Sequence, residues 1–136
     1  MKQAKKMPVM EKKEEVKRIM ERVKSFEEAC KEENIDPNSV LPYENPETDD
    51  EIYLNTVMKM TVITRALNEG REKSSCVYFP YFRKVSSGFV FAYTFYDAST
   101  ANTTASASRL CKYHSDTLAR YAGQTFVDLF EILCEK

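Results

Sequence analysis

Apolar residues recur at helical spacing in the first quarter of the chain. Steps of three and four residues separate five of them: Val16, Ile19, Val23, Phe26 and Cys30. This spacing places them on one stripe of a helix, opposite positions that are mainly Lys and Glu. The pattern predicts one helix over residues 10–34, which ends before Pro37 because the residue before a proline avoids the helical conformation. Residues 1–9 are expected to form a flexible tail.

The strongest helix signal follows Thr48. Thr48 and Glu51 have the spacing of a capping box, in which each side chain accepts a hydrogen bond from the other residue's backbone N–H. The apolar residues of Ile52–Leu67 occupy more than one stripe, so we expect this helix to be central and largely buried. Gly70 can adopt the left-handed conformation that ends many helices. Before this helix, Asp36–Ser39 predicts a turn or one capped turn of helix.

The middle of the chain has the period of two that is typical of strands. Cys76–Arg83 and Phe89–Tyr96 are rich in aromatic residues, and the short turn Ser86–Gly88 between them predicts an antiparallel hairpin. Strict alternation places four aromatic residues of the second strand on one face: Phe89, Phe91, Tyr93 and Phe95. Pro80 has no N–H to donate, so we expect it at an edge or a bulge.

The last third of the chain predicts a loop, a short strand and a helix. Residues 98–108 lack large apolar groups, which favours a mobile loop. Arg109–Tyr113 then predicts a third short strand, and Ser115 can cap a final helix. Gly123 lies inside that helix, where a close neighbour would explain it. The order α-α-β-β-β-α predicts a single α+β domain over residues 10–136, in which a small antiparallel sheet of two or three strands packs against helices.

Three parts of the sequence carry a resemblance in the following order: Ile63–Gly70 (ITRALNEG), Tyr78–Phe82 followed by Ser87–Phe89, and Ser108–Cys111 leading into Leu118–Phe126. Together they resemble a group of small uncharacterised proteins found among prophage and mobile-element genes of gut Bacteroidales. The resemblance covers about residues 50–130. It implies a phage-like context and no chemistry. The group carries tryptophans near the end of its second helix and in the aromatic strand, whereas this chain has none, so no role of those rings is carried over.

Composition narrows the class of protein. A length of 136 residues with 43% apolar and 30% charged residues fits one globular domain. The 20 Lys and Arg residues nearly balance the 21 Asp and Glu residues, which argues against a diffuse polycation such as a histone-like binder. No apolar run has the length of a membrane span or a signal peptide, so we expect a soluble cytoplasmic protein. Cys30, Cys76, Cys111 and Cys134 form no CxxC pair, and free thiols are expected.

The candidate catalytic and metal-binding groups form no complete set. His114 could pair with Cys111 or Asp116, but no nucleophile elbow or oxyanion loop accompanies them. Cys111 and His114 are also half of a zinc pattern, which Cys76 could complete only through long-range folding. The carboxylates of Glu44–Glu51 lack the spacing of a calcium loop, and three glycines cannot build a phosphate-binding loop. We expect a non-enzymatic protein without catalytic residues, metal or cofactor, and keep a hydrolase centred on Cys111 and His114 as a third hypothesis.

The aromatic segment supports a hypothesis of single-stranded nucleic-acid binding. Nine of the twenty residues from 77 to 96 are aromatic, and basic residues flank them. Single strands bind where bases stack on rings and cations follow the phosphates. The candidate residues are Tyr78, Tyr81, Arg83, Lys84, Phe89, Phe91, Tyr93, Arg109 and Lys112. The same alternation is typical of a sheet face that packs on helices, and the sequence does not distinguish exposed rings from buried ones.

The first helix supports the leading hypothesis, which is a protein interaction. Its stripe has the spacing of a coiled-coil interface, so four residues are candidates for binding a partner: Val16, Ile19, Val23 and Phe26. Packing of the stripe on its own domain explains the pattern equally well. The leading expectation is a small interaction or assembly module, associated with a phage or mobile element. It would bind a protein partner or a second copy through this helix or the aromatic hairpin, with nucleic-acid binding as the alternative.

Overall fold

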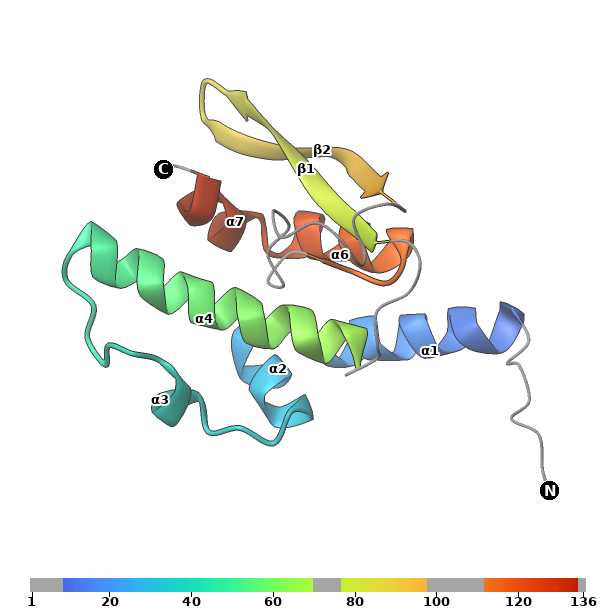
Figure 1. Ribbon diagram of the computed structural model, residues 1–136, viewed down its shortest axis with the longest axis horizontal. Helices are drawn as coiled ribbons and strands as arrows, with labels where there is room; N and C mark the ends of the chain where they lie inside the picture. Colours follow the sequence, from blue (N-terminus) through green and yellow to red (C-terminus); the bar gives the residue numbers. More distant parts are fainter. Residues whose placement is uncertain (1–8, 70–76, 98–111, 135–136) are drawn as a thin grey trace.

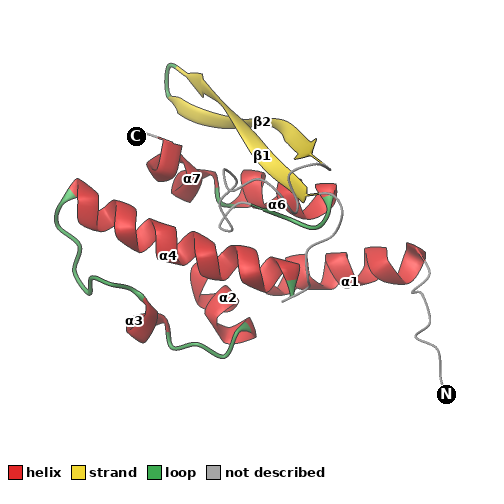
Figure 2. Cartoon of the chain, viewed as in Figure 1, coloured by secondary structure: helices red, strands yellow, loops and turns green. Residues whose placement is uncertain are grey.

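The computed structural model describes residues 9–69, 77–97 and 112–134, and these residues form three layers (Figure 1). The elements are α1 (Val9–Arg22), α2 (Phe26–Glu32), α3 (Pro37–Val40), α4 (Asp49–Asn68), β1 (Val77–Val85), β2 (Gly88–Asp97), α6 (Asp116–Thr125) and α7 (Val127–Cys134). The hairpin of β1 and β2 is one outer layer, α6 and α7 lie beneath it, and α4 with α1 and α2 forms the layer on the far side. Figure 2 shows the described helices gathered on one side of the hairpin. The α+β fold is therefore confirmed.

Two expected segments fall largely outside the described residues. The expected tail is residues 1–9, of which the structure describes only Val9, the first residue of α1. The expected loop at residues 98–108 lies wholly outside them. None of the described helices combines the length and the apolar character that crossing a membrane requires.

Helix α4 begins as its sequence predicts. The Thr48 hydroxyl accepts a hydrogen bond from the Glu51 N–H at 3.1 Å, and the Glu51 carboxylate accepts one from the Thr48 N–H at 3.3 Å. The helix ends after Asn68, in the segment where its end was expected, and Glu69 adopts the left-handed conformation with φ of 55°. Gly70, the expected left-handed residue, lies outside the described residues. The short helix α3 is the capped turn expected at Asp36, whose side chain accepts from the Asn38 N–H.

The first helical segment consists of two helices, so the prediction of one helix over residues 10–34 is wrong. Ser25 has an extended backbone, with φ of −152° and ψ of 166°, and separates α1 from α2. Its hydroxyl accepts a hydrogen bond from the Glu28 N–H at 3.1 Å, while the Glu28 carboxylate accepts one from the Lys24 N–H at 2.8 Å. Ser25 and Glu28 thus form a capping arrangement that starts a new helix within a continuous apolar stripe.

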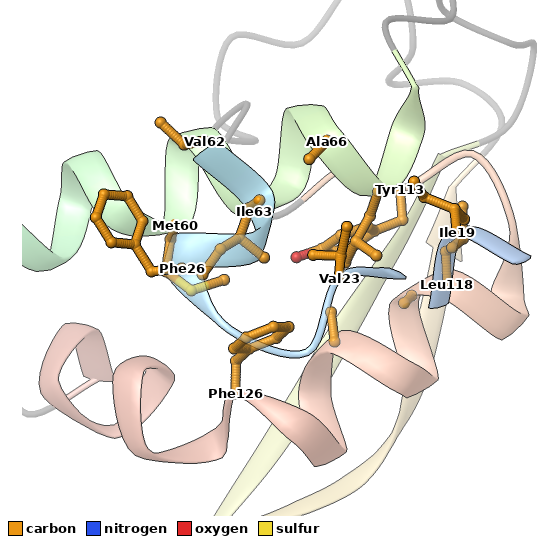
Figure 3. Packing of buried hydrophobic residues seen from close by; sticks show 14 of the residues in the cluster. Ile19, Val23, Phe26, Met60, Val62, Ile63, Ala66, Tyr113, Leu118 and Phe126 are labelled. Carbon is orange, nitrogen blue, oxygen red and sulfur yellow. The ribbon is translucent and has the colours of Figure 1, made fainter. Parts of the chain in front are cut away.

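The apolar stripe of this segment is a face of the protein's own core. Ile19, Val23 and Phe26 are 1%, 0% and 6% exposed, and Val16 is partly buried against them. Figure 3 shows the stripe side chains meeting those of α4, α6 and Tyr113. A partner cannot reach these three buried side chains in this conformation. The assignment of the stripe to partner binding is therefore corrected, and its packing alternative holds.

The elements near the C-terminus also differ from their prediction. Of the expected strand over residues 109–113, the described part contributes one bridge, in which Tyr113 and Tyr78 exchange two backbone hydrogen bonds of 2.9 Å. The expected single final helix is divided at Phe126, which leaves helical geometry while its ring is buried in the core. Backbone bonds from Phe126 to Ala122 and from Phe130 to Phe126 continue across the division. No proline marks this bend, so the apolar periodicity did not reveal it.

The hairpin contains a bulge that changes which side chains share a face. Tyr81 pairs with Tyr93 and Phe82 pairs with Phe91, so Ala92 is an extra residue in β2. Phe91 consequently faces α6, where the Arg120 guanidinium lies 6.0 Å from its ring centre. Tyr93 points away from the helices and is half exposed. The expectation that strict alternation holds Phe91 and Tyr93 on one face is wrong, because a bulge inverts the alternation beyond it.

Candidate nucleic-acid interface

Two stacked tyrosines stand on the outer face of the hairpin. Tyr81 and Tyr93 lie opposite each other on β1 and β2, with ring centres 4.8 Å apart and ring planes 17° from parallel. They are 52% and 50% exposed, which places both among the exposed large hydrophobic residues of the described chain. Cross-strand aromatic contact holds the two rings together. The pair therefore offers flat aromatic surface to a ligand.

The inner face of the hairpin holds this outer face in place. Phe82 packs against the Phe130 ring of α7 at 4.9 Å between ring centres, and Tyr78 packs against the core. Gly123 of α6 approaches Pro80 and Phe91 so closely that a Cβ atom there would meet both. Since α6 and α7 anchor the inner side chains, the outer side chains do not contribute to the core. The exposed surface of Tyr81 and Tyr93 stays accessible.

Two cations line one hollow together with the tyrosine pair. Arg83 and Lys84 are exposed on β1, and no salt bridge of the described residues involves either of them. A hollow of about 520 Å³ lies against this part of the hairpin. Its lining consists of Tyr81, Phe82, Arg83, Lys84, Phe91, Ala92 and Tyr93. Because these lining residues include two cations and no carboxylate, the hollow favours an anionic ligand. We call the exposed set of Tyr81, Arg83, Lys84 and Tyr93 the tyrosine face.

The structure brings together five of the nine residues that the sequence suggested for nucleic acid. Tyr81, Arg83, Lys84, Phe91 and Tyr93 all line the hollow. Phe82 and Ala92 line it as well, and sequence reasoning missed both. The bulge places Ala92 in the lining of the hollow. The sequence signal nearest to this bulge was Pro80 in β1, which was expected at an edge or a bulge.

The other four suggested residues are absent from the hollow. Tyr78 uses its backbone to bridge Tyr113, and its side chain packs against the core. Phe89 donates its backbone N–H to the Glu131 carboxylate of α7 at 2.9 Å. The Lys112 carbonyl accepts a hydrogen bond from the Asn68 side chain, at the end of α4. Arg109 lies outside the described residues.

The proposed His114 site has a structural neighbour in Asn68. The Asn68 side-chain oxygen accepts a hydrogen bond from the His114 backbone N–H at 3.1 Å, which fixes the start of α6 against α4. Cys111 and Cys76 lie outside the described residues, so the pairs that involve them stay predictions. Within the described ranges, no three metal-ligating side chains gather at one place.

Asp116 serves as an anchor between β2 and α6. The Thr94 hydroxyl donates a hydrogen bond to its carboxylate, and this bond is the main reason that the pKa of Asp116 lies below its ordinary value. Arg120 lowers the pKa further through a hydrogen bond and its charge.

Burial raises the pKa values of the Cys30 and Cys134 thiols, so neither is activated as a thiolate.

Comparison of the chain with protein-family models, with curated proteins and with solved structures gives no match. The chemistry of the tyrosine face therefore provides the indication of function. That face combines stacked, half-exposed rings with two exposed cations that line the same hollow. These are the elements that single-stranded nucleic-acid sites combine.

Proposed function

We propose that this protein is a small non-enzymatic interaction module that acts in a phage or mobile-element context and binds its partner through the tyrosine face. The observation that carries the proposal is the half-exposed, stacked pair of Tyr81 and Tyr93 beside Arg83 and Lys84. Large apolar rings held on a solvent-facing surface are typical of interaction sites. The other candidate surface, the stripe of the first helical segment, is occupied by the protein's own core.

Single-stranded nucleic acid is the partner that this face fits best. Every base has a flat π surface, so stacking on Tyr81 or Tyr93 does not require a particular sequence. Arg83 and Lys84 supply positive charge within the same hollow, where the phosphates of the strand would lie. The chain as a whole has a net charge of −1, so attraction to a polyanion depends on this local cluster.

The test is fluorescence anisotropy of a labelled single-stranded oligonucleotide titrated with the protein at low and moderate salt. We expect salt-sensitive binding. Tyr81→Ala weakens it by the loss of about one stacked base, which is about 1–3 kcal/mol. Arg83→Ala weakens it and reduces the slope of log K against log salt by about 0.7–1, because one phosphate contact is lost.

Matched controls come from exposed residues outside the hairpin. Tyr53→Ala removes an exposed tyrosine of α4, and Arg18→Ala removes an exposed cation of α1. Both controls should bind the oligonucleotide as the unmodified protein does. Absence of binding at low salt would refute the nucleic-acid assignment and direct the search to a protein partner for the same face. Equal losses in the control variants would refute the tyrosine face as the site.

A further inference from the structure

A two-stranded sheet has two outer edges, and the structure protects them unequally. The outer edge of β1 is blocked at its N-terminal half. Tyr78 exchanges backbone hydrogen bonds with Tyr113 there, and Pro80 has no N–H to offer. Natural proteins use such devices to prevent an edge from pairing with another chain.

Among the residues that the structure describes, the edge of β2 is protected only near the hairpin turn. The Glu131 carboxylate accepts the Phe89 N–H at 2.9 Å, and the bulge at Ala92 interrupts regular pairing. Beyond the bulge, Tyr93–Asp97 pairs with β1 in five consecutive rungs without irregularity. We call the outer side of Tyr93–Asp97 the open edge.

The pairing register shows where the backbone groups of the open edge point. Tyr78 directs its N–H and C=O to Tyr113. Tyr78 and its partner Tyr96 therefore form a non-hydrogen-bonded pair of the hairpin, in which the backbone N–H and C=O groups of both residues face away from the other strand. Such pairs recur every two residues along the strands, so Pro80 and Thr94 also form a non-hydrogen-bonded pair. The N–H and C=O of Thr94 therefore face outward, and no backbone hydrogen bond of the described residues occupies them.

We propose that the open edge pairs antiparallel with the open edge of a second copy, which joins the two hairpins into one four-stranded sheet. The whole of β2 contains no Lys, Arg, Glu or Pro, and its only charged residue is Asp97 at the end. In an antiparallel pair centred on Phe95, each Asp97 lies opposite Tyr93 of the other copy. The strand is therefore complementary to itself, since no like charges meet.

The two-fold axis of an antiparallel pair is perpendicular to the sheet, so the outer faces of both copies lie on the same side. Two stacked pairs of Tyr81 and Tyr93 would then share one continuous surface. The helices α6 and α7 of both copies would lie on the other side, where they lie in the single chain. Self-association does not require nucleic acid, so this proposal can be tested separately from the proposed function.

The test is the oligomeric state of the full chain, measured by sedimentation equilibrium over a range of concentrations without nucleic acid. The unmodified protein should form a dimer. Thr94→Pro removes the outward N–H without breaking a bond to β1, and it should weaken the dimer at least tenfold. Thr94→Val loses the hydroxyl bond to Asp116 but keeps the N–H, so it should dimerise as the unmodified protein does. A monomeric unmodified protein, or unchanged dimerisation of Thr94→Pro, would overturn the proposal.

Amide hydrogen exchange keeps the proposal testable if Thr94→Pro does not fold. In the unmodified protein, the Thr94 amide should exchange slowly at high protein concentration and rapidly on dilution. The Phe95 amide faces β1 and should be protected at both concentrations. Exchange of the Thr94 amide that does not depend on concentration would contradict pairing at the open edge.

Discussion

At Gly123 the fold leaves no room for a side chain. A Cβ atom there would lie 2.4 Å from Cδ1 of Phe91 and 2.9 Å from Cβ of Pro80. Both neighbours belong to the hairpin, so this glycine sets the distance between α6 and the sheet. The sequence suggested a close neighbour at this position, and the structure identifies it as the inner face of the hairpin.

Gly123→Ala should therefore destabilise the protein although it improves the helix propensity of α6. Overpacking costs about 1–3 kcal/mol, and the gain in propensity is about 1 kcal/mol. We expect a net loss of about 1 kcal/mol in the free energy of unfolding, measured by urea denaturation. Gln124→Ala changes the exposed neighbour and should not lower stability. A variant at 123 as stable as the unmodified protein would contradict the close contact.

Thr94→Val should raise the pKa of Asp116 toward its ordinary value of 3.8, because the hydroxyl that stabilises the carboxylate is lost. The lowered pKa means that Asp116 contributes stability above pH 3.8, and that this contribution is lost as the pH falls through the pKa of the folded state. Carboxyl NMR titration measures the change. Thr117→Val, on the exposed side of α6, should leave the pKa of Asp116 where it is. An unchanged titration of Asp116 in Thr94→Val would rule out the hydroxyl as the cause.

At the scale of elements, hydrogen-bond capping decides where the helices begin. The box of Thr48 and Glu51 starts α4, and Ser25 with Glu28 starts α2. Tyr121 stabilises the break between α1 and α2, since its hydroxyl lies 2.9 and 2.7 Å from the carbonyls of Met20 and Val23 at the end of α1. Hydrogen bonds therefore stabilise both the end of α1, through Tyr121, and the start of α2, through Ser25.

Ser25→Ala should lower the free energy of unfolding by about 1 kcal/mol, because the Glu28 N–H loses its acceptor. Ser25→Asp keeps an acceptor at the same place and should retain most of the stability. Chemical denaturation of both variants measures the difference. If Ser25→Ala unfolds at the same denaturant concentration as the unmodified protein, the cap does not hold α2 in place.

The sequence predicted the elements that depend on local pattern and missed the features that depend on packing. The hairpin, the capping box of α4 and the apolar stripe were all readable from spacing. The breaks at Ser25 and Phe126 were missed because apolar periodicity continues through both, although Ser25 and Glu28 have the same spacing as Thr48 and Glu51. Pro80 suggested an edge or a bulge in β1, but no residue type demands the bulge at Ala92 in β2. This bulge decided the candidate site, because it separates Tyr93 from Phe91.

At the scale of the whole molecule, the layered arrangement separates residues that hold the fold from residues that can bind. The hairpin covers α6 and α7 with its inner face, and the first helical segment buries its stripe against α4. Exposure of the tyrosine pair could not be read from alternation alone, because it follows from having helices on one face of the sheet only. Tyr81 and Tyr93 of the tyrosine face take no part in the hydrophobic core.

Substitutions on the two faces of the hairpin should therefore affect stability differently. Phe82→Ala removes a ring that packs on Phe130, and it should cost about 3 kcal/mol of the free energy of unfolding. Tyr81→Ala removes only a cross-strand contact, which is worth about 0.2–1 kcal/mol. Thermal or urea unfolding measures both. Equal losses would mean that Tyr81 belongs to the core rather than to a binding surface.

Nucleic-acid binding by the tyrosine face is tested most directly by a nitrogen–proton NMR titration of the labelled protein with a single-stranded oligonucleotide at low salt. If the tyrosine face binds the strand, the backbone signals of Tyr81, Arg83, Ala92 and Tyr93 shift as the oligonucleotide is added. The signals of Ile52, Tyr53 and Leu54 of α4, whose side chains are also large, apolar and exposed, should stay in place. The absence of any shift, or shifts confined to residues away from the tyrosine face, would show that this face does not bind single-stranded nucleic acid.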